Sequence, residues 1–251
     1  MAAAIKLHRH AGRRRAGRFL AEGPNLVEAA LRRGAVVEVF ATEAARTRFA
    51  SMLSGVPVHV VTEQAARKLS DTVTPVGLVA VCEARTPTVD QILPRQPRLI
   101  VVAVGVAEPG NAGTLIRLSH AFGASAVILA GNSVDPYNAK CLRASAGSVF
   151  ALPVLVEPDA AATLGALAQA GVQIFATMLD GDVTLDEVEP QLGAPTAWLF
   201  GSEAHGLPAE IADLADRRVR IPMPGGTESL NVAAAAAICL YESARRQGSS
   251  R

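Results

Sequence analysis

Three short loops hold the residues best suited to chemistry, and the first loop spans residues 105–113. Its three glycines lack the spacing of a dinucleotide-binding loop, and no lysine follows them as in a P-loop, so the pattern excludes both kinds of phosphate loop. Asn111 stands where a helix is expected to begin, and Arg117 follows almost two turns later among mostly apolar residues. The two residues are either a substrate-binding pair or an ordinary helix N-cap and surface cation.

The second loop, residues 200–208, directly follows an apolar segment. Gly201 and Gly206 allow a ligand to approach the backbone closely, and Glu203 between them supplies a carboxylate. Ser202 is not expected to be a nucleophile, because the Gly-x-Ser-x-Gly pattern of a nucleophile elbow is absent around it. The loop is therefore either part of a ligand site or a simple turn into the next helix.

The third loop runs from Ile221 to Asn231 and contains two prolines and two glycines. This composition predicts a stiff turn that costs little conformational entropy to hold. Ser229 and Asn231 stand at the mouth of an alanine-rich, apolar helix. Ser229 could be the N-cap of that helix with Asn231 as a spare amide, or both side chains could face a ligand.

The segments that carry these loops alternate between strands and helices from residue 98 onward. Strands are expected at 99–105, 125–130, 153–156, 172–177, 197–201 and 218–221, and helices at 111–122, 138–145, 160–170, 208–214 and 229–246. Strands such as 99–105 are continuous apolar runs, which is typical of a parallel sheet buried on both faces. In such sheets ligands bind at the carboxyl ends of the strands, so the sequence predicts an α/β fold with all three loops at one edge.

The first third of the chain predicts a separate, small α/β domain at residues 18–84. Helices are expected near 24–33, 43–53 and 63–69, and strands near 36–42, 56–61 and 77–82. Residues 85–97 contain three prolines and are expected to be a linker to the second domain at 98–251. Residues 1–17 are expected to form a basic arm, because the first 18 residues hold six lysines and arginines and no acid. Such an arm is either a solvated tail or a contact to a polyanion.

Composition narrows the class of protein. The chain has 251 residues, of which 50% are hydrophobic and 19% charged, and this excludes a mainly disordered protein. The apolar run at residues 232–240 is shorter than the roughly 20 residues of a membrane span. No apolar stretch follows the basic N-terminus as in a signal peptide, so we expect a cytoplasmic protein without a membrane partner. The three cysteines are far apart, which favours buried thiols and predicts no metal site.

Taken in order, the three loops resemble the signature motifs of the SpoU (TrmH-type) RNA ribose 2′-O-methyltransferases of the SPOUT superfamily. The matching segments are Asn111-Ala-Gly-Thr-Leu-Ile-Arg117, Phe200-Gly-Ser-Glu203-Ala-His-Gly206-Leu-Pro208 and Ile221-Pro-Met…Glu228-Ser-Leu-Asn231-Val-Ala-Ala. The resemblance covers roughly residues 98–246. Residues 18–83 also look like the small substrate-binding domain of many such enzymes, on the segments Phe19-Leu-Ala-Glu-Gly-Pro-Asn25 and Thr74-Pro-Val-Gly77-Leu-Val-Ala.

This resemblance implies a mostly parallel α/β SPOUT domain whose C-terminal segment forms a deep trefoil knot, with S-adenosylmethionine (AdoMet) as methyl donor bound in the knot. It also implies a homodimer with the site close to the dimer interface. The positions that match cofactor contacts, largely through backbone groups, are Thr177, Gly201, Ile221, Met223 and Leu230. The positions that match catalytic residues are Asn111, Arg117, Glu203, Ser229 and Asn231.

Family analogy assigns removal of the ribose proton to Arg117, but a guanidinium in a protein is effectively never deprotonated. We therefore expect Arg117 to hold the neighbouring phosphate and stabilise the developing alkoxide, while the other four residues orient the arginine and the ribose. The expected acceptor is structured RNA, ribosomal RNA rather than transfer RNA, and the need for a 2′-hydroxyl excludes DNA. The sequence does not identify the target nucleotide.

Three alternatives stay open from the sequence. A transfer RNA could be the acceptor, or the chain could be a catalytically silent RNA-binding protein. A serine hydrolase would use Ser229 or Ser202 with His120 or His205, but the sequence offers it neither an elbow nor an ordered acid partner.

Overall fold

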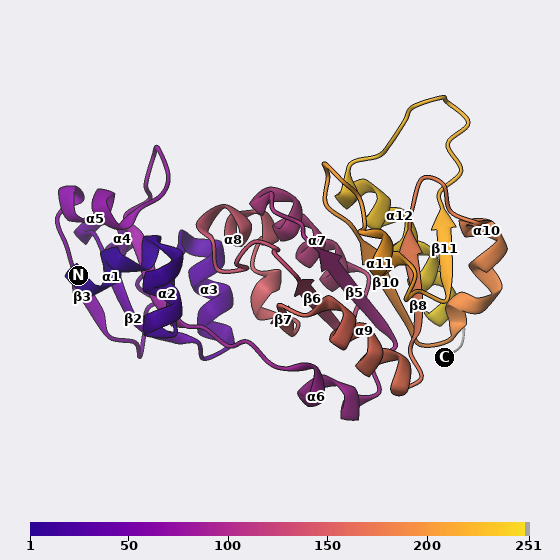
Figure 1. Cartoon of the computed structure of the whole chain (residues 1–251). Coiled ribbons are helices and arrows are strands. Elements are labelled where there is room, and N and C mark those ends of the chain that lie inside the picture. The colour runs from indigo at the N-terminus through magenta and orange to yellow at the C-terminus, as the bar shows by residue number, and fades with distance from the viewer. Residues whose placement is uncertain (249–251) are drawn as a thin grey trace.

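Two β-sheets organise the chain, and the computed structural model describes residues 1–248 of it. The N-terminal part consists of α1 (Ala2–Ile5), η1 (Lys6–His8), α2 (His10–Ala16), β1 (Arg18–Glu22), α3 (Pro24–Arg32), β2 (Val36–Ala41), α4 (Glu43–Arg48), β3 (Val58–Val60), α5 (Glu63–Leu69) and β4 (Leu78–Glu83), where η denotes a 3-10 helix. Its strands form one sheet in the order β1-β4-β2-β3. This part lies at one end of an elongated molecule (Figure 1).

The C-terminal part holds the larger sheet. Its elements are β5 (Leu99–Val104), α7 (Pro109–Ala121), β6 (Ala126–Ala130), α8 (Ala139–Ser145), η3 (Ser148–Phe150), β7 (Val154–Glu157), α9 (Ala160–Gln169), β8 (Gln173–Thr177), β9 (Val183–Thr184), α10 (Leu185–Val188), η4 (Glu189–Gly193), β10 (Thr196–Phe200), α11 (Ala209–Ala212), β11 (Arg217–Arg220) and α12 (Val232–Gly248). The strand order is β7-β6-β5-β10-β8-β11-β9, and every pairing in this sheet is parallel. The predicted parallel α/β fold is confirmed.

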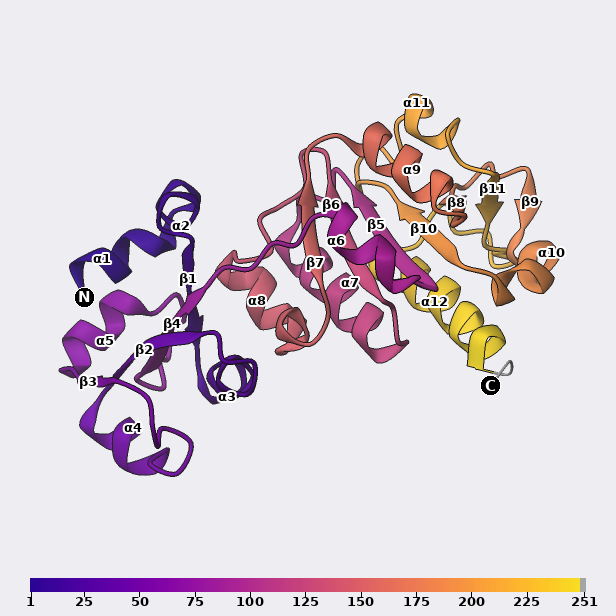
Figure 2. The same cartoon turned by 90° about the horizontal axis from the view of Figure 1, so that it is seen from below.

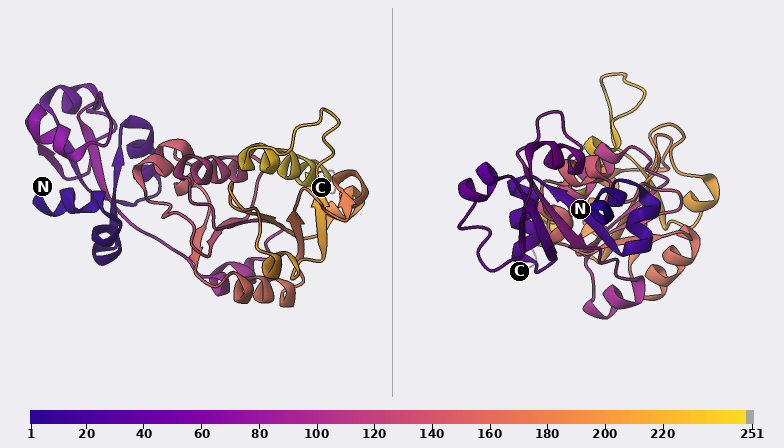
Figure 3. Two further views of the ribbon diagram at one scale, coloured as in Figure 1. Left: turned by 45° about the horizontal axis from the view of Figure 1, so that its top comes forward. Right: turned by 90° about the vertical axis from the view of Figure 1, so that its left-hand side faces the viewer.

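The apolar strands make this sheet the middle layer of three, as the left view of Figure 3 shows. All six residues of β5 are buried, and alternate residues face opposite layers. Val101 and Ala103 join the core under α7, α8 and α12, whereas Ile100 and Val102 join the core under α9 and α11. Figure 2 shows these two groups of helices on opposite sides of the sheet. None of the helices described for residues 1–248 is long and apolar enough to cross a membrane.

The N-terminal residues differ from the expected basic arm, because residues 2–16 fold as short helices against the body. Ala4 and Leu7 are buried, and the side chain of Arg13 is only 8% exposed. The Arg13 guanidinium pairs with Asp135, with Nε 2.7 Å from Oδ2, and also donates to the carbonyl oxygens of Leu7 and His8. The expected arm was based on the positive charge of the segment alone. The apolar residues between the cations give the segment a face that packs against the body.

Further contacts join the two parts around the loop that follows β6. Tyr137 stacks on Phe19 with ring centroids 4.3 Å apart, and its hydroxyl donates to the carbonyl of Arg85 at 2.7 Å. Between the sheets, residues 84–98 contain the short helices α6 (Val89–Ile92) and η2 (Leu93–Arg95). The domain boundaries and the trefoil knot stay predictions of the sequence.

Candidate active site

A cavity of about 580 Å³ opens at the edge of the large sheet where β8, β10 and β11 end. The loop between β11 and α12, which forms one wall, extends well away from the body of the molecule (Figure 1). All five residues expected to contact a cofactor line this cavity: Thr177, Gly201, Ile221, Met223 and Leu230. The sheet edge therefore brings together segments that lie more than 40 residues apart in the sequence.

The second loop folds back on itself beside the cavity. The backbone of Ser202 and Gly206 exchanges two hydrogen bonds, of 3.1 and 2.9 Å. A Cβ on Gly201 would lie 2.1 Å from the carbonyl carbon of Gly206, so only glycine fits at position 201. Sequence reasoning assigned this glycine to close approach by a ligand, and the structure adds that the loop itself occupies the space.

Side chains from the first turn of α7 and from the loops after β10 and β11 meet in one polar network at this cavity. The Asn111 amide donates from Nδ2 to Oε1 of Glu203 at 2.6 Å. The Asn231 amide donates from Nδ2 to Oδ1 of Asn111 at 3.1 Å. Glu203 and Asn231 line the cavity, and so does Ser229. Four of the five expected catalytic residues thus lie in or directly beside one site.

Asn231 has a second role, because it caps α12. Its Oδ1 accepts the backbone N–H of Ala233 at 2.9 Å, so the helix begins at Val232. Of the two alternatives that the sequence left open for Ser229, the role of helix cap is wrong, since the loop continues two residues further and Asn231 is the cap. Capping occupies the Oδ1 of Asn231 and leaves its Nδ2 directed at Asn111.

The N-cap of α7 is Glu108, where the sequence interpretation offered Asn111. Glu108 Oε2 accepts the backbone N–H of Asn111 at 2.7 Å, and its other oxygen accepts from Lys140 Nζ at 2.5 Å. These hydrogen bonds, the one from Lys140 above all, hold the pKa of Glu108 below its ordinary value. Sequence reasoning missed Glu108, although Pro109 directly after it is a usual start signal for a helix, because proline favours the first helical position.

Arg117 is the expected site residue that the structure does not bring to the cavity. It is exposed on α7 and is absent from the cavity lining. Six residues separate it from Asn111, which in a helix means about 9 Å along the axis and a different face. Among residues 1–248 it makes no hydrogen bond or ion pair.

The serine hydrolase alternative finds no support in the geometry. Ser202 Oγ accepts the backbone N–H of His205, and the ring of His120 contacts Ser148 at 3.2 Å. Within residues 1–248, no histidine ring is hydrogen-bonded to Ser202 or Ser229. A histidine base for a serine nucleophile is therefore missing.

Comparisons with known proteins agree with this arrangement over nearly the whole chain. The family model of the SpoU rRNA Methylase family matches residues 98–241, and that of the MRM3-like substrate binding domain matches residues 3–80. The 23S rRNA (guanosine(2553)-2′-O)-methyltransferase RlmP of Bacillus subtilis is 34% identical over 241 residues, which cover 94% of this chain and 92% of that protein. A 23S rRNA (uridine(2479)-2′-O)-methyltransferase of Streptomyces viridochromogenes is 36% identical over 180 residues, 70% of this chain and 63% of that protein.

Solved structures give the same result. The SpoU methyltransferase AviRb of Streptomyces viridochromogenes, in complex with AdoMet, superposes with a TM-score of 0.87 at 30% identity, covering 99% of this chain and 97% of that chain. The AdoMet-bound rRNA methyltransferase of Sinorhizobium meliloti superposes with a TM-score of 0.86 at 32% identity, covering 97% of this chain and 93% of that chain. Both likenesses include the N-terminal sheet as well as the cavity.

Proposed function

The chain belongs to the SpoU rRNA methylase family, and from this premise we propose that it transfers a methyl group from AdoMet to a ribose 2′-hydroxyl of ribosomal RNA. The observation that carries the proposal is the network in which Asn111 bonds to both Glu203 and Asn231 beside the cavity. The relatives named above act on guanosine and on uridine, so the motifs that they share with this chain do not select the base. The target nucleotide is left open, and the cytoplasm is the proposed compartment.

The cavity fits AdoMet in its charge as well as its size. Two carboxylates, Glu203 and Asp180, line it, and no lysine or arginine does so among the described residues. A volume of about 580 Å³ lies within the range of small-molecule sites. When bound, AdoMet supplies an electrophilic methyl group on a positively charged sulfonium. A site that offers two carboxylates and neither lysine nor arginine among the described residues suits such a ligand.

The chain's own residues have to hold the ribose and help its hydroxyl lose a proton. Glu203, Asn231 and Asn111 fix one another in place, and we assign the orientation of the ribose to them together with Ser229. Fixed donors of this kind are typically worth about 3 kcal/mol of barrier each. Arg117, on the exposed face of α7 and outside the cavity, is assigned to the phosphate next to the target ribose.

A homodimer is part of the proposal, supported by an apolar face on α12. Ile238 and Tyr241 stand one turn apart and are 38% and 54% exposed. Tyr241 contacts Phe122, at the end of α7, edge to face with ring centroids 6.2 Å apart. A second copy of the chain on this face would cover these side chains. Sedimentation of the wild type and of the double variant Ile238→Asp/Tyr241→Asp tests the homodimer. We expect the wild-type protein to be a dimer and the double variant to be a monomer.

Methyl incorporation is the direct test of the activity. Protein and labelled AdoMet are incubated with ribosomal RNA, transfer RNA and DNA from a strain that lacks the gene. We expect label in ribosomal RNA alone, at one mapped 2′-hydroxyl. Label in transfer RNA alone would favour the tRNA alternative, and binding of AdoMet and RNA without any label would favour a silent RNA-binding protein.

A further inference from the structure

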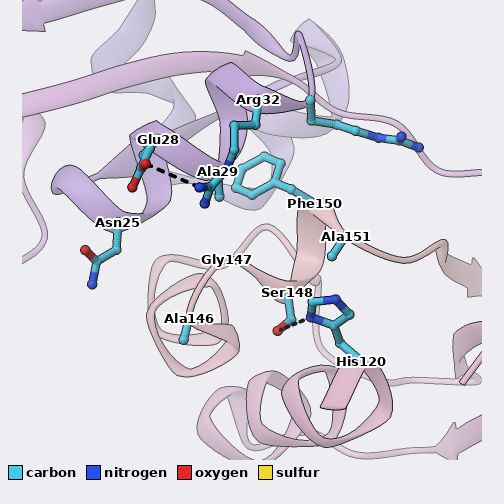
Figure 4. Close-up of a pocket in the computed structure, with 11 residues that line it drawn as sticks. Asn25, Glu28, Ala29, Arg32, His120, Ala146, Gly147, Ser148, Phe150 and Ala151 are labelled. Atoms are coloured by element: carbon cyan, nitrogen blue, oxygen red, sulfur yellow. Dashed lines mark hydrogen bonds and ion pairs between the residues drawn. The ribbon is translucent and has the colours of Figure 1, made fainter. Parts of the chain in front are cut away.

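We propose that a cleft between the two parts of the molecule binds a backbone phosphate of the substrate RNA, apart from the ribose that is methylated. The cleft has a volume of about 490 Å³ and lies between α3 on one side and the α8–η3 turn with the end of α7 on the other (Figure 4). The inference rests on the proposed RNA methyltransferase activity and names a second contact to the same substrate.

The polar groups in the cleft are mainly hydrogen-bond donors. Arg32 and Arg33 contribute guanidinium groups, and Asn25 contributes an amide from the segment that resembles a substrate-binding motif. On the opposite wall His120 lies 3.2 Å from the buried hydroxyl of Ser148 (Figure 4). Two permanent positive charges and several neutral donors suit a phosphodiester group, because this group is an anion whose oxygens only accept hydrogen bonds.

Glu28 is the one carboxylate in the cleft, and it is already paired. Its Oε1 accepts from Arg32 at 3.3 Å, and both side chains are more than half exposed. Exposed pairs of this kind contribute little, typically 0 to about 1 kcal/mol. A phosphate can therefore displace Glu28 from Arg32 at small cost.

The walls of the cleft are held by a close approach between the two parts. Gly147 has φ +88°, and a Cβ there would lie 3.0 Å from the Cβ of Ala29. The preceding residue, Ala146, also has a positive φ of 48°. The turn after α8 thus presses directly against α3, and the cleft beside it has a defined width.

The cleft is placed where RNA at the active site can reach it. His120 and Asn111 lie on the same helix, α7, and nine residues in a helix span about 14 Å. Arg117 is exposed on the same helix between them. Nine residues also make about two and a half turns, so His120 faces away from Asn111, and an RNA strand that places its ribose at Asn111 has to extend by a few nucleotides and pass around α7 to reach the cleft.

The test measures RNA affinity as a function of salt for wild type and Arg32→Ala/Arg33→Ala, on a ribosomal RNA that the wild type methylates. We expect roughly tenfold weaker binding at moderate salt and a slope of log K against log salt reduced by about one, because one lost phosphate contact removes about 0.7 to 0.9. Arg46→Ala/Arg48→Ala on α4 removes the same charge elsewhere and should bind like the wild type. Affinity for AdoMet should be equal in all three proteins.

Glu28→Gln provides a result in the opposite direction. It frees Arg32 without removing a cation, so RNA binding is expected to tighten by about twofold. An unchanged slope in Arg32→Ala/Arg33→Ala, an equal loss in the α4 control, or no gain in Glu28→Gln would overturn the proposal. Inorganic phosphate provides a further outcome. If Arg32→Ala/Arg33→Ala abolishes its binding but leaves RNA affinity unchanged, the cleft binds a small anion and not RNA. Wild-type protein that methylates no RNA would refute the proposed function, which is a separate outcome.

Discussion

Asn231 and Asn111 are 120 positions apart in the chain, yet the amide of the first donates to the amide oxygen of the second at 3.1 Å. Each residue also stabilises the start of its own helix region, Asn231 as the cap of α12 and Asn111 through its backbone N–H to Glu108. The first turns of two helices are therefore fixed to each other at the cavity. Substitutions here can be designed to separate the network from the caps.

Asn231→Asp and Asn231→Ala separate these two roles. Aspartate keeps an oxygen that can cap α12 but loses the donor to Asn111, so methyl transfer should fall while the free energy of unfolding stays close to wild type. Alanine loses both, and should also lose about 1 kcal/mol of stability. Single-turnover rates and urea unfolding measure the two effects. Wild-type turnover in Asn231→Asp would remove the network from the mechanism.

Arg117→Ala should abolish methyl transfer while the fold and the affinity for AdoMet are kept. The side chain is exposed and lies outside the cavity, so its loss should change stability by no more than about 0.5 kcal/mol. Arg117→Lys keeps the charge but not the paired donors, and should recover only part of the rate. A rate equal to wild type in Arg117→Ala, on a proven RNA substrate, would reduce this residue to a surface cation.

The lowered pKa of Glu108 predicts that the stability of the fold depends on pH. Hydrogen bonds from Lys140 and from the backbone of Asn111 hold its pKa below the ordinary 4.5. The folded protein thus binds this proton less tightly than the unfolded chain. The carboxylate stabilises the fold above about pH 4.5, and this contribution is lost as the pH falls through the lowered pKa.

Glu108→Gln should therefore flatten the acid side of the curve of unfolding free energy against pH. Urea unfolding at several pH values from about 3 to 6 measures this slope. Glu63→Gln, at an exposed acid in the first turn of α5, is the matched control for the loss of one surface carboxylate. Equal slopes for wild type and Glu108→Gln would contradict the assignment. We also expect slower methyl transfer in Glu108→Gln, since Asn111 is held less firmly.

Gly201→Ala should weaken AdoMet binding by at least roughly tenfold, because the added Cβ would collide with the backbone of Gly206 and Leu207 and displace a wall of the cavity. Gly225→Ala is the control, since a Cβ at that position meets nothing within 4 Å. Isothermal titration compares the two. Normal affinity in Gly201→Ala would mean that the loop can move without affecting the cofactor site.

The large sheet and the location of the site could be predicted from the sequence. Continuous apolar runs such as Leu99–Val104 bury both faces of a strand, and a parallel sheet then places the loops that follow its strands at one edge. The match of three motifs identified residues that indeed line one cavity, such as Gly201 and Leu230. These features depend on local pattern, which a sequence displays directly.

Contacts over long separations could not be predicted. Arg13 stands among exposed cations, and its burial depends on the carboxylate of Asp135, 122 residues away, as well as on two local carbonyl oxygens. The ion pair of Glu108 with Lys140 depends in the same way on how α7 and α8 pack. The position of Arg117 away from the cavity follows from its six-residue separation from Asn111 within α7, which places it about 9 Å further along the helix and on a different face.

The negative charge of the cavity predicts a difference in affinity between AdoMet and its demethylated product. Asp180 and Glu203 face a ligand that carries a sulfonium, whereas the demethylated product carries a neutral sulfur at the same position. Asp180→Asn should therefore weaken AdoMet by roughly two- to fivefold and leave the affinity for the demethylated product nearly unchanged, with the difference reduced at high salt. Asp182→Asn removes a neighbouring charge outside the cavity lining and should affect neither ligand. Equal losses for both ligands in Asp180→Asn would show that this carboxylate shapes the cavity and does not sense the methyl-bearing charge.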